Sequence, residues 1–106
     1  MVEKILNDAG IRNKPTRFLK PPKGTYAVWF DRYTKSGADM RKTIYNHSCS
    51  IELYSYEVDD VAENLIEIEL DKRALEYTKQ ERVWLQSEQL WEVIYTFDYK
   101  AKEAIT

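Results

Sequence analysis

The sequence contains few of the residues that form covalent cross-links or bind metal ions. It has one cysteine, Cys49, and one histidine, His47, among 106 residues. A single cysteine excludes an intramolecular disulfide, so a reducing compartment is the natural expectation. No apolar run approaches the roughly 20 residues that span a bilayer, and the N-terminus lacks the order of a signal peptide. We therefore expect a protein made in the cytosol that has no membrane partner.

Glycine and proline are equally scarce, with three of each. The isolated glycines provide no loop of the kind that holds a phosphate. The three prolines fall within residues 12–24, which we expect to be irregular because proline fixes φ and removes a hydrogen-bond donor. Carboxylates are numerous, but no pattern places two of them in a cleft where their pKa values would separate.

His47 and Cys49 are the only pair that suggests catalysis or metal binding. They lie two residues apart, so in an extended strand they point the same way, and a metal site or a thiol–imidazole pair could start there. The sequence shows no third group to orient the imidazole and no further His or Cys to complete a metal site. We therefore expect Cys49 to be a small buried hydrophobe. The sequence predicts no enzyme, no metal site and no cofactor.

Aromatic and branched residues, by contrast, are abundant and alternate with polar ones in several segments. This period of two is typical of half-buried strands, and spacings of three and four are typical of helices. We expect a helix over 2–9 ended by Gly10, a strand over 25–32 and a turn-prone loop over 34–39. Strand pairing is expected to continue through 42–46 and 48–56, with a bend near Asn46–His47. A helix over 59–75, strands over 82–85 and 90–99, and a flexible tail over 100–106 complete the prediction.

These elements predict a single α+β domain over residues 1–99, with an antiparallel sheet of about four to five strands. Their order is αβββαββ, with both helices packed on one face of the sheet. Asp59 or Asp60 is expected to cap the second helix. Its apolar face is expected to comprise Val61, Ala62, Leu65, Ile68 and Leu75, widened by Ile66 and Leu70.

Charge is distributed unevenly along the chain although the net charge is only −2. Residues 10–42 carry nine basic and two acidic side chains, a net charge of +7, and residues 43–106 carry a net charge of −8. Such asymmetry is typical of nucleic-acid binding, of an oppositely charged partner, or of contact between copies of one chain. It also fits two solvated faces with no partner. The residues that we expect to contact a subunit or DNA are Arg12, Lys14, Arg17, Lys20, Lys23, Lys35, Asp39, Arg41 and Lys42.

Aromatic side chains provide a second candidate surface. Helices can cover only one face of the sheet, so some aromatics are expected to remain on the other face, where patches usually mark protein contacts. We assign Tyr54, Tyr56, Trp91 and Tyr95 to this assembly surface.

Short segments along nearly the whole chain, up to about Tyr99, carry a family resemblance: Ile5–Gly10, Tyr26–Phe30, Gly37–Asp39, Ile51–Tyr54, Glu63–Glu67 with Leu70–Asp71, and Ser87–Tyr95. In these segments the sequence resembles the tail completion proteins of siphophages and prophages of Gram-positive bacteria, also called tail terminator or tail-to-head joining proteins. The resemblance implies an α+β subunit of a hexameric ring that caps the tail tube and meets the head connector. It implies no catalysis, and it implies a place at the head–tail junction of the virion after assembly in the host cytoplasm. The basic, proline-rich 12–23 segment departs from the family pattern.

Residues and resemblance together lead to one hypothesis. The 34–41 loop and the basic 12–23 segment would reach from one subunit to the next, or into a lumen where they would make non-specific contact with DNA. The alternative is a small nucleic-acid-binding or regulatory interaction domain, which predicts salt-dependent retention of the monomer on DNA. The sequence leaves these alternatives open.

Overall fold

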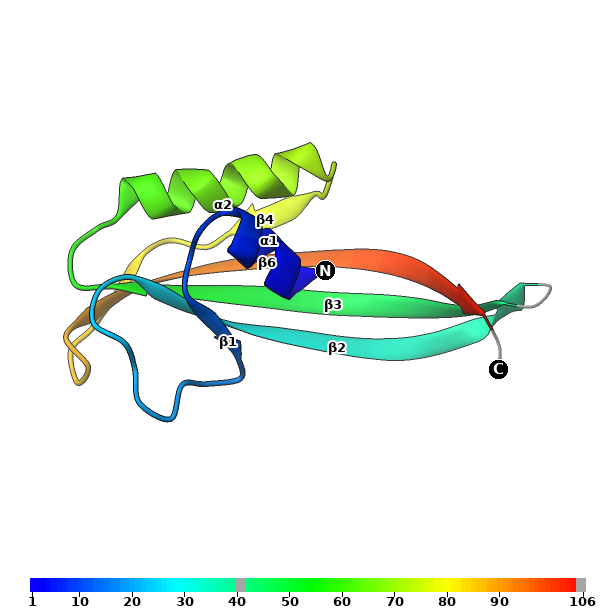
Figure 1. Ribbon diagram of the computed structural model, residues 1–106, viewed down its shortest axis with the longest axis horizontal. Coiled ribbons are helices and arrows are strands. Elements are labelled where there is room, and N and C mark those ends of the chain that lie inside the picture. The colour runs from blue at the N-terminus through cyan, green and yellow to red at the C-terminus, as the bar shows by residue number, and fades with distance from the viewer. Residues whose placement is uncertain (40–41, 105–106) are drawn as a thin grey trace.

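The computed structural model describes residues 1–39 and 42–104, which form one sheet with two helices on one face (Figure 1). The sheet order is β1-β2-β3-β6-β4, and β5 also pairs with β6. Only the β1–β2 pair is parallel. The elements in chain order are α1 (Val2–Asp8), β1 (Asn13–Pro15), β2 (Tyr26–Asp39), β3 (Lys42–Ser55), α2 (Asp60–Lys72), β4 (Tyr77–Lys79), β5 (Val83–Leu85) and β6 (Leu90–Ala104). The predicted α+β class is confirmed.

Helix α1 ends as its sequence predicts. Gly10 has a φ of +75°, the left-handed conformation that glycine adopts without steric cost. The chain then turns back, because the Ile11 amide donates to the Leu6 carbonyl at 3.0 Å and the Ile11 side chain is buried. The turn therefore seals the end of α1 against the core.

Three long antiparallel strands, β2, β3 and β6, form the centre of the sheet. Alternate residues on one face, among them Ile51, Leu53 and Tyr95, are fully or almost fully buried under the helices. Both helices contribute to this single core, α1 through Ile5 and Leu6. Burying each large aliphatic side chain stabilises the fold by roughly 1.5–3 kcal/mol, so the helix-covered end of the sheet holds the domain together.

Helix α2 begins as predicted but packs through a different face. The Asp59 side chain caps it by accepting a hydrogen bond from the Ala62 amide at 3.0 Å. The buried stripe is Ala62, Ile66 and Leu70, flanked by the buried carboxylates Glu63 and Glu69. The predicted apolar face was therefore wrong in part, since Val61, Leu65 and Ile68 are exposed. The helix is apolar around much of its circumference, so its own pattern did not fix which side faces the sheet.

Several strand boundaries also differ from the prediction. The sheet has six strands instead of four to five, because the three-residue β1 and β4 add to its edges. The segment expected to be a loop, 34–39, continues β2, and the register irregularity lies between Lys35 and Ala38 instead of near Asn46–His47. Strand β6 pairs with β3 as far as Ala104, where a tail was predicted. The last two differences arise because the long strands stabilise one another by pairing far beyond the core.

Candidate assembly surfaces

The three long strands extend past both helices and form a projecting arm (Figure 1). We define the arm as residues 32–39 of β2, 42–48 of β3 and 98–104 of β6, which pair with one another. It contributes to the elongated shape of the molecule, whose principal extents are 50 × 28 × 22 Å. No described side chain of the arm is buried. Core packing therefore does not account for the arm.

Both outer edges of the arm lack a strand partner among the described residues. Strand β1 pairs with β2 only at Ala27–Trp29, and β4 pairs with β6 only at Tyr95–Phe97. Exposed edges of this length present unpaired backbone groups to solvent or to a partner. Native proteins usually shorten or cover such edges, so the open arm is a candidate surface for contact with another chain.

One face of the arm carries an aromatic cluster that continues the helix-covered face of the sheet. His47 stacks on Tyr99 with ring centroids 4.4 Å apart and an interplanar angle of 4°. Tyr33 lies 5.4 Å from Tyr45 and 5.7 Å from His47, and the Lys35 ammonium lies 5.8 Å from the Tyr45 ring centre. Tyr33 is 57% exposed. We call Tyr33, Tyr45, His47 and Tyr99 the arm aromatic cluster.

The outer side of α2 presents a second exposed apolar surface. Val61, Leu65 and Ile68 follow i, i+4, i+7 spacing and are 71%, 39% and 39% exposed. Val58, just before the helix, is exposed as well. We call Val61, Leu65 and Ile68 the α2 outer stripe. Between residues 57 and 72 the sequence contains seven acidic side chains and one basic side chain, so this surface is apolar with acidic surroundings.

An ionic cluster fixes α2 in the orientation that exposes this stripe. Arg82 donates two hydrogen bonds to the buried Glu63 carboxylate, Nε to Oε2 at 2.8 Å and Nη2 to Oε1 at 2.9 Å. The Lys79 ammonium lies 2.8 Å from both Glu63 Oε1 and Glu67 Oε2. Tyr95 donates its hydroxyl proton to Glu67 Oε2 at 2.8 Å. These bonds join α2 to the β4–β5 segment and to β6.

The electrostatics of the cluster favour charged carboxylates. Burial by itself would raise the pKa of Glu63 and of Glu67. Hydrogen bonds from Arg82 and Lys79 to Glu63, and from Lys79 and Tyr95 to Glu67, outweigh burial and hold both pKa values below the ordinary 4.5. Burial and the hydrogen bond to Glu67 raise the pKa of Tyr95 far above its usual value, so this hydroxyl stays protonated and continues to donate.

The basic 12–23 segment divides into a structural part and an exposed part. Arg12 is structural, since its guanidinium donates to the Lys23 carbonyl and closes the loop. The remaining predicted contact residues of this segment have exposed side chains: Lys14, Arg17, Lys20 and Lys23. Leu19, between two of them, is 88% exposed. The loop therefore presents positive charge around an exposed apolar residue.

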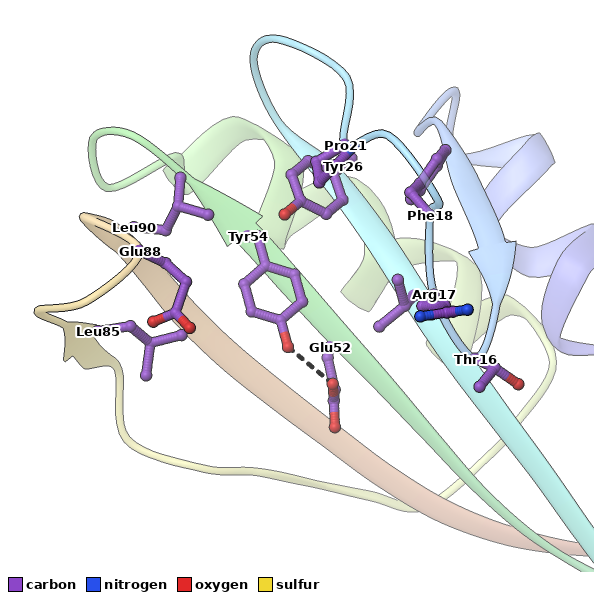
Figure 2. A pocket seen from close by; sticks show the side chains of 11 residues that line it. Thr16, Arg17, Phe18, Pro21, Tyr26, Glu52, Tyr54, Leu85, Glu88 and Leu90 are labelled. Carbon is purple, nitrogen blue, oxygen red and sulfur yellow. Dashed lines mark hydrogen bonds between the residues drawn. The ribbon is translucent and has the colours of Figure 1, made fainter.

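The loop also borders a depression of about 250 Å³ on the sheet face opposite the helices. Figure 2 shows loop residues on one side, the β5–β6 hairpin on the other, and two tyrosines between them. Burial and the hydrogen bond that Tyr54 donates to Glu52 at 2.8 Å raise the pKa of Tyr54. The lining residues labelled in the figure are Thr16, Arg17, Phe18, Pro21, Tyr26, Glu52, Tyr54, Leu85, Glu88 and Leu90.

The residues predicted to form one aromatic assembly surface do not lie together. Tyr95 is fully buried in the core, which is a correction, because its face of β6 is the one that the helices cover. Trp91 is on that same face of β6 and packs edge-on against Trp84 at 5.4 Å. Tyr54, stacked on Tyr26 at 5.3 Å, is on the opposite face, and Tyr56 is 57% exposed beyond the end of β3.

The remaining predicted contact residues map to the arm. Lys35 has an exposed side chain on β2, and the backbones of Asp39 and Lys42 pair with each other at the ends of β2 and β3. Arg41 lies outside the described residues. The members of the arm aromatic cluster were missed as contact residues, although period-two alternation along one strand would have placed Tyr45 and His47 on one face. Tyr33 joins them through its pairing with His47 in the β2–β3 register.

The geometry gives His47 and Cys49 no catalytic arrangement. His47 Nδ1 lies 2.7 Å from Asp31 Oδ1 and its ring stacks on Tyr99, so both interactions position the imidazole. Cys49 is buried, and its burial, together with the nearby Asp31 carboxylate, raises the pKa of its thiol to about 12.

Among the described residues no group of three or more His, Cys, Asp or Glu is placed to hold a metal ion. In the same part of the chain, neither helix has the length and apolarity needed to cross a membrane.

Comparison with solved structures finds the same fold in a chain described as part of the virion of a native gene transfer agent particle. The TM-score is 0.61, and the superposition covers 93% of this chain and 84% of that chain at 11% sequence identity. At this identity the match shows a shared fold. No protein-family model matches the sequence, and no curated protein sequence matches it.

Proposed function

We propose that this protein is a structural, non-enzymatic subunit of a phage-like virion. Its copies form a ring, hexameric as in the tail completion proteins that the sequence resembles, and this ring caps the tail tube and joins it to the head connector. The observation that carries the proposal is the match of fold over 93% of the chain to a virion particle chain. The family resemblance of the sequence supports the same place in the particle.

The surfaces of the molecule support an assembly role. The arm projects from the core with both outer edges without a strand partner among the described residues, and α2 exposes Val61, Leu65 and Ile68 on its outer side. Different exposed surfaces on one molecule are compatible with head-to-tail contact, which generates a ring when the rotation closes. An exposed arm and an exposed helix face thus provide the two halves of a repeating interface.

Deletion of the coding sequence from its phage or prophage tests the proposed function. The expected result is that particles no longer assemble, with filled heads separate from tails or with tails of uncontrolled length, and that a plasmid copy restores infectious particles. Normal particles in the deletion strain would contradict the proposal. Flanking genes for capsid, connector and tail-tube proteins are expected beside the coding sequence.

The exposed basic loop favours a second candidate function, direct binding of nucleic acid. Arg17, Lys20 and Lys23 would release counterions from a phosphate backbone, so binding would weaken steeply with salt. The test is retention of the isolated protein on DNA at several salt concentrations. Reversal of Arg17 and Lys20 to Glu is expected to abolish any retention through this loop, and Lys4→Glu on α1 is the matched control.

A further inference from the structure

The depression on the sheet face opposite the helices is lined by a polar group that the fold leaves without a partner (Figure 2). Tyr26 lines it, and this side chain is only 8% exposed. Its ring contacts Phe18 and Tyr54, but its hydroxyl makes no hydrogen bond among the described residues. Figure 2 shows that hydroxyl directed toward the side of the depression that carries Glu88 and Leu90. An unpartnered hydroxyl in this position marks a place where a polar group of a ligand can bond.

Two carboxylates that line the same depression lack a cationic partner. Glu52 is half-buried and accepts a hydrogen bond from Tyr54 at 2.8 Å, and Glu88 lies on the wall formed by the β5–β6 hairpin. Within the described part of the chain, neither carboxylate forms an ion pair. Glu92 is opposite Tyr54 in the β3–β6 register and adds a third negative charge beside the depression, whereas Arg17 is the one cation that lines it. The depression is therefore negatively charged.

We propose that this depression binds the guanidinium group of an arginine side chain that a partner protein presents. The site goes beyond the proposed ring and does not depend on it. A guanidinium has five N–H donors in a planar fork, so it can bond to several acceptors at once. The acceptors that line the depression are the carboxylates of Glu52 and Glu88 and the hydroxyl oxygen of Tyr26.

The size and the walls of the depression fit one side chain of a protein. Its volume is about 250 Å³, below the roughly 300–1,000 Å³ of pockets that enclose whole small ligands. Apolar residues border it on both sides, Phe18 and Pro21 from the loop and Leu85 and Leu90 from the hairpin. Such walls pack against the methylene stem of an arginine while its charged end reaches the carboxylates. On the same loop Leu19 is 88% exposed, which suits a protein partner better than a free polyamine.

The acceptors are held in place before any ligand binds. The hydrogen bond from Tyr54 orients the Glu52 carboxylate, and Tyr26 is stacked on Tyr54 with ring centroids 5.3 Å apart. Burial, followed by the neighbouring Tyr56 and Glu88, raises the pKa of Tyr26, so its hydroxyl stays protonated and neutral. A site that is already ordered loses less conformational entropy on binding.

An amide NMR titration of the full chain tests the site. The probe is a capped glycine–arginine–glycine peptide, and the control is the same peptide with uncharged citrulline in place of arginine. The arginine peptide is expected to shift the amides around Tyr26, Glu52 and Glu88 with a dissociation constant on the order of 1 mM, because one side chain makes few contacts. The citrulline peptide is expected to bind about tenfold more weakly, since it lacks the charge. Equal binding of the two peptides, or shifts confined to other parts of the chain, would overturn the site.

Variants of the lining residues distinguish a cation site from an anion site. Glu52→Gln and Glu88→Gln are each expected to weaken binding of the arginine peptide about tenfold, whereas Glu76→Gln, exposed outside the depression, leaves it unchanged. Tyr26→Phe is expected to weaken binding and to leave thermal stability unchanged, because the lost hydroxyl has no partner in the free protein. Arg17→Gln is expected to strengthen binding, because it removes a like charge. Weaker binding to the Arg17→Gln protein would overturn the cation site.

Putrescine is the probe for a free polyamine, which would use the same acceptors. The arginine peptide is expected to bind more tightly than putrescine, because only a guanidinium has the planar fork of donors. If putrescine shifted the same amides at a lower concentration, the assignment to a protein side chain would be overturned. None of these titrations depends on the deletion experiment, so the site and the proposed function can fail separately.

Discussion

At the residue scale, Glu63 shows how a carboxylate comes to be buried beside an apolar stripe. It lies beside Ala62 and Ile66 on the covered face of α2, where an unpaired charge would be costly. Arg82 and Lys79 compensate by direct ion pairs from the β4–β5 segment. The sequence offered no signal for this pairing, because the partners are 16 and 19 residues away, Lys79 at the end of the short strand β4 and Arg82 just before β5. This long-range contact explains why the helix face was predicted only in part.

The lowered pKa values of Glu63 and Glu67 predict acid sensitivity of the fold. A carboxylate with a lower pKa in the folded state adds stability that is present in full above the ordinary value of 4.5 and is lost as pH falls through the folded value. The free energy of unfolding, measured by urea titration, is therefore expected to fall below pH 4.5. Glu67→Gln is expected to flatten this decline, whereas Glu57→Gln, an exposed control, leaves it in place.

The hydrogen bond of Tyr95 is expected to affect the stability of the fold and not the assembly of copies. Its hydroxyl is buried and bonds to Glu67, so Tyr95→Phe is expected to lower the free energy of unfolding by about 1–2 kcal/mol. Its aromatic ring remains, and the exposed surfaces are unchanged, so self-association is expected to stay normal. Tyr56→Phe, at an exposed position, is the control and changes neither quantity. If the Tyr95→Phe protein kept its normal stability and no longer assembled, Tyr95 would act in assembly and not in the core.

At the element scale, sequence periodicity placed the main elements correctly and misjudged where they stop. Gly10 and Asp59 are local signals, and both mark helix ends as expected. The far ends of β2, β3 and β6 have no such signal, because pairing with neighbouring strands determines how far each one continues. Polar residues such as Thr34 and Lys35 are read locally as a loop, and yet they pair with β3.

The same reasoning predicts a gradient of stability along the sheet. The arm has no described buried side chain, so its amides are expected to exchange with solvent through local opening, whereas those near Ile51 exchange only on global unfolding. In the proposed ring, a neighbouring copy would contact the arm and α2. Hydrogen-exchange mass spectrometry is therefore expected to show protection gained at residues 32–37 and 98–102 on assembly, together with residues 61–68 of α2.

Protection that appears elsewhere on assembly, with the arm and α2 unchanged, would contradict this assignment of the interface. The exposed loop over 16–23 is the internal reference. It lies outside the proposed contact between copies, so its exchange is expected to remain fast in the isolated ring.

At the scale of the whole molecule, both the charge along the chain and the exposed surfaces are distributed unevenly. The net charge is +7 over residues 10–42, which include the basic loop and β2, and −8 over residues 43–106, which include α2. The sequence showed this charge asymmetry, but it did not show which side chains form the exposed surfaces. The aromatic residues assigned to one surface from sequence are divided between both faces of the sheet and the core. Two different exposed surfaces on one chain, the arm and the outer side of α2, fit the proposed head-to-tail ring better than a symmetric dimer.

The mass of the assembled protein tests this account most directly. Native mass spectrometry of the unmodified chain over a series of concentrations is expected to show monomer giving way to one closed oligomer of fixed copy number, with dissociation promoted by salt. Monomer at every concentration, or a dimer that grows no further, would contradict the head-to-tail ring.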